Sequence, residues 1–82
     1  MEYLTLDQDA KRAVLHAQIK EAEAEHYAIS VTVQLAYQLA DDPQTNGDSS
    51  SQYRQQGIAA ERRLRELTLQ IEKYHAMLEE LG

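Results

Sequence analysis

Residues 27–40 read YAISVTVQLAYQLA and contain no Asp, Glu, Lys or Arg, whereas 27% of the whole chain is charged. The segments on both sides of this stretch are acidic, basic or polar. Hydrophobic side chains concentrated in this way need an apolar neighbour, because leaving them in water is unfavourable. We therefore expect Tyr27–Ala40 to be buried at the centre of an assembly.

The stretch fits both a strand and a helix. Ile29, Val31 and Val33 alternate with polar residues, as in a half-buried strand. However, the strongly helix-forming run EAEAEH leads into the stretch, and neither Gly nor Pro occurs before Pro43. A single strand would also have no partner in so small a chain. The sequence therefore predicts one helix over about residues 6–41.

A loop and a second helix follow. Pro43 disfavours the α conformation of the residue before it, so the first helix is expected to end there. The segment PQTNGDSSS has the composition of a turn, which predicts a loop over residues 42–51. A second helix is predicted over about residues 52–81, although Gly57 lowers its helix propensity by about 1 kcal/mol relative to alanine. Its apolar residues alternate steps of four and three, as in a coiled coil: Ala60, Leu64, Leu67, Ile71, Tyr74, Leu78 and Leu81.

Two long helices joined by a short loop predict an all-α fold. The chain is expected to form a single domain over residues 1–82, in which the helices make an antiparallel hairpin. With the turn near Asn46, Leu64 is expected to lie opposite Ala28. The second helix would then cover one apolar stripe of the first helix: Ala28, Val31, Leu35 and Leu39.

The first helix carries a second apolar stripe that one facing helix does not cover. This stripe comprises Ile29, Val33, Ala36, Tyr37 and Ala40. A helix that is apolar on most sides is normally buried on more than one side, and large apolar patches are uncommon on monomers. A homodimer would bury both stripes and give a four-helix bundle. The predicted interface, with a second copy or with a different protein, comprises Tyr27, Ile29, Val31, Val33, Leu35, Tyr37 and Leu39.

Length and composition agree with self-association. A chain of 82 residues buries only ~60% of its unfolded surface, and small domains compensate with disulfides, metals or oligomerisation. The sequence has no cysteine, so disulfides are excluded. The net charge of -6 disfavours nucleic-acid binding.

No stretch reaches the ~20 apolar residues of a membrane span, and the first residues lack the pattern of a signal peptide. A soluble, cytoplasmic protein is therefore expected.

A repeated pattern indicates a metal site as an alternative function. Glu-x-x-His occurs at residues 23–26 and 72–75, and this spacing puts both side chains on one helix face. Di-iron four-helix proteins combine one Glu from each of two helices with Glu-x-x-His from the other two. On this pattern Glu21, Glu72 and His75 of each chain would be the iron ligands. The segment IEKYHAML, residues 71–78, also resembles the second-helix motif of ferritin-like proteins. This resemblance implies a di-iron oxidase assembled at a dimer interface.

Arginines are concentrated in the first half of the second helix. Arg62, Arg63 and Arg65 would be the contacts of a hairpin that binds RNA or DNA, which is a second alternative. The intervening Glu61 and Glu66 and the acidic balance of the chain favour instead a solvated surface of arginines.

The sequence shows no recognisable enzyme motif. Ser49–Ser51 match no nucleophile motif, and the chain has no Gly-rich phosphate loop. The pattern therefore favours a small, acidic, self-associating hairpin without a cofactor rather than an enzyme. Such a protein acts through protein–protein contact, as an assembly component, an adaptor or an inhibitor of the kind that phages and mobile elements encode.

Overall fold

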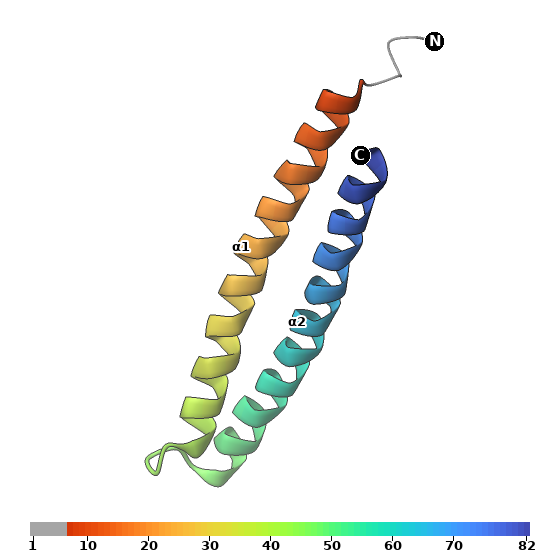
Figure 1. Ribbon diagram of the computed structural model, residues 1–82. Helices are drawn as coiled ribbons and strands as arrows, with labels where there is room; N and C mark the ends of the chain where they lie inside the picture. Colours follow the sequence, from red (N-terminus) through yellow and green to blue (C-terminus); the bar gives the residue numbers. More distant parts are fainter. Residues whose placement is uncertain (1–6) are drawn as a thin grey trace, which may run out of the picture.

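The computed structural model describes residues 7–82 and confirms an all-helical hairpin (Figure 1). Helix α1 spans Gln8–Asp41, and helix α2 spans Gly47–Leu81. The two helices pack against each other, and the molecule measures 61 × 21 × 15 Å. All of Tyr27–Ala40 is helical, so the alternative prediction of a strand in this stretch is wrong.

Local signals determine both ends of α1. Asp7 is the N-cap, because its carboxylate accepts a hydrogen bond of 2.7 Å from the backbone N–H of Ala10. Asp9 adds negative charge to the first turn, where the helix dipole favours it. At the other end Asp42 is extended, as expected for the residue before Pro43. The predicted start near residue 6 lies outside the described residues.

Helix α2 begins at Gly47, five residues before the predicted position, so the loop is only 42–46. Asn46, expected in a turn, is the N-cap, and its side chain accepts a 2.9 Å hydrogen bond from the backbone of Ser49. Asp48 lies in the first turn, where its charge is favourable. These end effects compensate for the low helix propensity of the glycine and serines, which the prediction took for a loop. Ser50 also donates a hydrogen bond to the carbonyl oxygen of Ala40, which joins the two helix ends.

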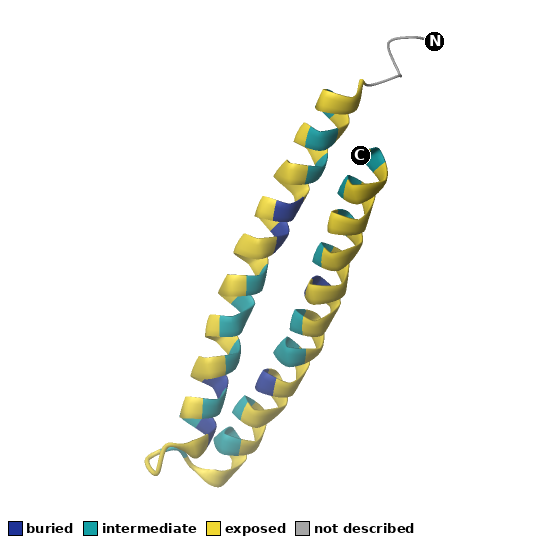
Figure 2. Cartoon of the chain, in the orientation of Figure 1, coloured by how far each residue is buried: buried dark blue, intermediate teal, exposed yellow. Residues whose placement is uncertain are grey.

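Figure 2 shows that the buried and half-buried residues lie mainly on the sides of the two helices that face each other. We call each of these rows of residues the seam of its helix. In α2 every predicted seam position is buried or half-buried, and Leu67 is 0% exposed. In α1 the seam residues again alternate steps of four and three, which is the spacing of coiled-coil packing. They are Leu15, Ile19, Ala22, His26, Ile29, Val33, Ala36 and Ala40.

The stripe of α1 that faces α2 is therefore not the predicted one. Ala22, Ala36 and Ala40 are buried, whereas Val31 and Leu35 are exposed. The contacts between the helices agree with this. Arg12 donates to the carbonyl oxygen of Gly82, and the side chains of His26 and Thr68 lie 3.3 Å apart. The predicted pairing of Leu64 with Ala28 is wrong, because Ala28 lies on the exposed side of α1.

Gly57 allows the helices to approach closely at the loop end of the hairpin. It is buried, and a Cβ placed on it would lie 3.0–3.2 Å from three ring atoms of Tyr37. A side chain at position 57 would therefore require the tyrosine ring to shift. The glycine that weakens α2 in isolation allows Tyr37 to pack closely against this helix.

Gly57→Ala is expected to have opposite effects on the free energy of unfolding in the wild type and in a Tyr37→Ala variant. Alanine is favoured over glycine in a helix by about 1 kcal/mol. In the wild type the clash with Tyr37 is expected to outweigh this gain, so the free energy of unfolding should fall. In a Tyr37→Ala background the same change should raise it by about 1 kcal/mol. Urea unfolding of the four proteins measures both effects, and equal effects in the two backgrounds would contradict the contact.

Candidate protein interaction surface

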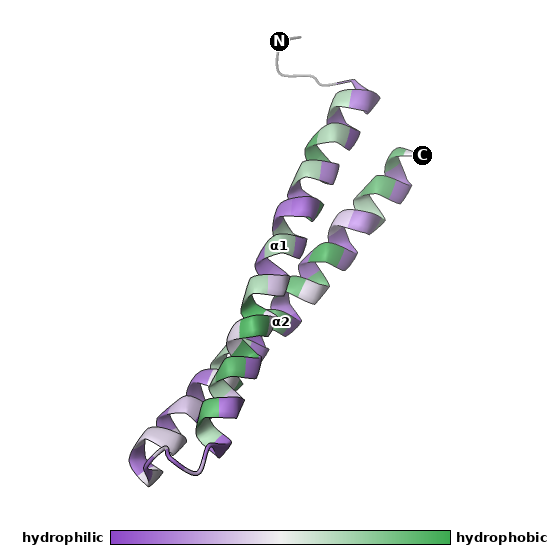
Figure 3. Cartoon of the chain, turned by 90° about the vertical axis from the view of Figure 1, so that its left-hand side faces the viewer, coloured by the Kyte–Doolittle hydropathy of each residue, from purple (hydrophilic) through white to green (hydrophobic). Residues whose placement is uncertain are grey.

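The face of α1 that points away from α2 exposes several large hydrophobic side chains. Tyr27 is 70% exposed, Leu35 is 54% exposed and Val31 is 44% exposed. Ala24 and Ala28 lie between them on the same side and are also exposed. Figure 3 looks at the hairpin from the side of α1 and shows strongly hydrophobic residues in the half nearer the loop.

The structure divides the seven predicted interface residues into two sets. Ile29, Val33 and Tyr37 are half-buried on the side of α1 that packs against α2, so they stabilise the hairpin itself. The expectation that the second helix leaves this stripe uncovered is therefore wrong. Leu39 is also half-buried. Tyr27, Val31 and Leu35 remain available to a partner.

Tyr37 links the two helices through a polar contact as well as through its ring. Its hydroxyl donates a hydrogen bond to the carboxylate of Glu61 on α2. This hydrogen bond, together with burial and the negative charge of Glu61, raises the pKa of Tyr37, and nearby Arg54 lowers it. The folded chain therefore holds the phenolic proton more strongly than the unfolded chain does.

The raised pKa of Tyr37 predicts a loss of stability at alkaline pH. The contribution of the hydrogen bond is complete below the ordinary tyrosine pKa of about 10 and is lost as pH rises through the higher folded value. The stability difference between wild type and Tyr37→Phe should therefore be constant below about pH 10 and shrink as the pH rises above it. Urea unfolding across this range measures it, with Tyr27→Phe as the control. A difference independent of pH would contradict the Glu61 contact.

The three proposed iron ligands do not come together within one hairpin. Glu21 precedes the buried Ala22 and Glu23 follows it, so these carboxylates flank the seam on opposite sides. Glu72 shares a groove with Glu23 and not with Glu21. Among the described residues no group of three His, Asp or Glu side chains is arranged to hold a metal ion. A single hairpin therefore does not hold Glu21, Glu72 and His75 as one ligand set, and the predicted iron site at a dimer interface stays a prediction.

A shallow groove of about 360 Å³ lies beside the middle of the seam. It is lined by Glu23, His26, Thr68, Ile71 and Glu72. The Thr68 hydroxyl donates to the Leu64 carbonyl oxygen and lies 3.3 Å from Nε2 of His26. His26 is thus a half-buried seam residue with a polar neighbour, which the sequence motif alone did not distinguish from a metal ligand.

Arg63 of α2 connects the two helices through hydrogen bonds. Arg63 donates hydrogen bonds to Glu25 of α1 at 2.8 and 3.2 Å and also contacts Glu66. The bond to Glu25 raises the pKa of Arg63 further above its ordinary range. Arg62 and Arg65 are exposed. One of the three predicted nucleic-acid contacts is therefore engaged within the hairpin.

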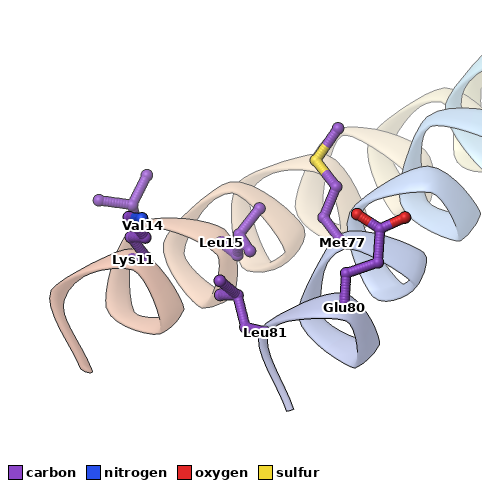
Figure 4. Close-up of a pocket in the computed structure, with 6 residues that line it drawn as sticks. All are labelled: Lys11, Val14, Leu15, Met77, Glu80 and Leu81. Carbon is purple, nitrogen blue, oxygen red and sulfur yellow. The ribbon is translucent and has the colours of Figure 1, made fainter. Parts of the chain in front are cut away.

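A second groove, of about 460 Å³, lies at the open end of the hairpin, where the two helix ends meet (Figure 4). Its apolar walls come from Val14 and Leu15 of α1 and from Met77 and Leu81 of α2, and Lys11 and Glu80 flank them. Val14 and Met77 are about half exposed, at 50% and 48%. This groove is a separate apolar surface at the end opposite the loop.

Neither α1 nor α2 contains a segment apolar enough over a sufficient length to cross a bilayer. Comparisons of the chain with protein-family models, with curated proteins and with solved structures found no match.

Proposed function

We propose that the hairpin acts through protein–protein contact and associates with itself. A dimer of hairpins would bring four helices together, as in a four-helix bundle. Its roles would be those of an assembly component, an adaptor or an inhibitor. The observation that carries this proposal is the imbalance between a small core and a large exposed apolar surface.

The core of a single hairpin is thin. Among residues 7–82 five hydrophobic residues are buried, and three of them are alanines, so Ile19 and Leu67 are the only large side chains in this set. Against these, several large hydrophobic side chains on the described surface are 44% exposed or more: Val14, Tyr27, Val31, Leu35, Ile58, Leu69 and Met77. Chains of this size with so little core usually gain stability from oligomerisation.

The shape of the hairpin leads to the same proposal. The chain of 9.4 kDa exposes 6340 Å², whereas a compact monomer of this mass would expose about 5,000 Å². The difference exceeds the ~800 Å² that each partner buries in a typical specific interface. The elongated hairpin therefore has enough surface for a partner without losing its own contacts.

The dependence of thermal stability on concentration tests this proposal. Association stabilises the folded state by mass action, so the unfolding midpoint should rise with protein concentration. Circular dichroism from ~1 to ~100 µM, a range in which typical dimers dissociate, would show the rise. A midpoint that stays constant, in a protein that is helical and monomeric at every concentration, would contradict self-association.

A further inference from the structure

The outer α1 face consists of exposed residues that point away from α2: Ala24, Tyr27, Ala28, Val31, Gln34, Leu35 and Gln38. No residue of this face is charged, and it extends over about 21 Å of the helix. Charged residues follow immediately beyond both ends, with Lys20 and Glu21 on one side and Asp41 and Asp42 on the other. The face is thus an apolar and amide-bearing patch between two charged borders.

We infer that a second copy of the chain covers the outer α1 face, with the two α1 helices antiparallel and a two-fold axis beside Val31. This inference rests on the proposed self-association and specifies its surface. The two α1 helices would lie at the centre of the dimer, and each α2 would lie on the outside. The four helices would then form one layer, and not the closed four-helix bundle that the sequence predicts. The seam between α1 and α2 described above remains unchanged.

The antiparallel arrangement pairs large side chains with small or polar ones. Residues equally far before and after Val31 lie at the same level in a two-fold dimer. Leu35 is thus level with the partner's Tyr27, but helical periodicity puts these two side chains on opposite sides of the contact. The neighbour of Leu35 is therefore the partner's Ala28, one position along, and the neighbour of Tyr27 is the partner's Gln34. Val31 meets the partner's Val31 at the axis. Each large side chain therefore has room, and the Tyr27 hydroxyl and the amide of the partner's Gln34 can form a hydrogen bond.

Charge at the borders selects the antiparallel orientation. Lys20 lies eleven residues before Val31 and Asp42 lies eleven residues after it, so each lysine would lie level with the partner's Asp42. Eleven residues are close to three helical turns, so both side chains lie near the centre line of the face. Lys20 forms no ion pair within the described residues. A parallel arrangement would instead put Lys20 level with the partner's Lys20 and Asp42 level with the partner's Asp42.

These border pairs favour a second copy over an unrelated partner. Exposed ion pairs contribute only about 0–1 kcal/mol, so they orient the helices more than they stabilise the dimer. The apolar contacts supply most of the stabilisation, and both halves of the complementary surface belong to the same face. The face therefore carries its own complement in shape, and the charges nearest its centre line, Lys20 and Asp42, are complementary.

Cysteine cross-linking tests the inference directly, because the chain has no cysteine of its own. Ala28→Cys and Leu35→Cys variants are mixed and oxidised, each carrying a different mass tag. The mixture is expected to give a heterodimer with one disulfide, whereas Leu35→Cys alone should remain uncross-linked. In the antiparallel dimer two Leu35 positions are about 12 Å apart along the helix, beyond the reach of a disulfide. Leu69→Cys, on an exposed position of α2, is the matched control and should not cross-link.

Three other results would overturn the inference in distinguishable ways. Efficient cross-linking of Leu35→Cys with itself would show a parallel dimer. No cross-linking in the mixture, with a dimer still present by native mass spectrometry, would show that another face is used and would leave the proposed self-association intact. If native mass spectrometry instead shows a folded monomer, or a complex with a different protein only, both proposals are wrong. Circular dichroism confirms that each variant remains helical.

Discussion

Leu67→Ala is expected to lower the free energy of unfolding by about 2–5 kcal/mol. Leu67 is the only large side chain of the described residues that is completely buried, so its removal leaves a cavity at the centre of the seam. The chain is small, and the typical stability per residue gives it only about 4–12 kcal/mol in total. Loss of one leucine therefore removes a large part of the stability, which urea unfolding followed by circular dichroism will measure.

Leu69→Ala provides the control for this prediction. Leu69 lies two residues further along α2 and is 58% exposed. Its substitution is expected to change the free energy of unfolding by no more than about 0.5 kcal/mol. Equal losses for the two variants would contradict the assignment of the α2 seam.

Val31→Asp is expected to abolish self-association while leaving the hairpin seam intact. In the proposed dimer the two new carboxylates would lie beside each other at the two-fold axis, in an otherwise uncharged contact. Like charges brought together in an interface cost several kcal/mol, which corresponds to a loss of affinity of about 100-fold or more. Native mass spectrometry of wild type and variant at equal concentration measures the change.

Two further variants separate a loss of contact from a loss of folding. Leu69→Asp places the same charge on the exposed side of α2 and should leave the dimer intact. Leu35→Asp acts on the outer α1 face away from the axis and should weaken the dimer as well. A dimer that survives both Val31→Asp and Leu35→Asp would exclude the outer α1 face as the contact.

The two helices were predictable from the sequence because the periodicity and the end signals are local. The α2 seam from Ala60 to Leu81 was predicted correctly, since only one stripe of that helix is apolar over several turns. The start of α2 was missed because the serine run suggested a loop. Capping by Asn46 and the charge of Asp48 favour a helix there, and both signals are visible in the sequence.

The seam of α1 was harder to predict, because Tyr27–Ala40 is apolar on more than one side. Within that stretch the exposed stripe through Val31 and the packed stripe through Val33 have the same spacing. The decisive residues lie earlier, where Ile19 continues the packed stripe while the exposed stripe passes through Glu21. The pattern over the whole helix, including these earlier residues, therefore favours the observed seam.

The role of Gly57 required the three-dimensional structure. Sequence identifies a glycine within a helix as destabilising, but the reason for its presence is the ring of Tyr37 on the other helix. The same holds for Glu61, whose hydrogen bond with Tyr37 spans 24 positions in the chain. Contacts of this kind depend on the register of the two helices, which no local pattern determines.

The mass of the wild-type protein in solution tests the central claim most directly. Sedimentation equilibrium or native mass spectrometry is expected to show an assembly of twice the 9.4 kDa of one chain, with a monomer that appears only on dilution. A stable, fully helical species of 9.4 kDa at all concentrations would contradict the account.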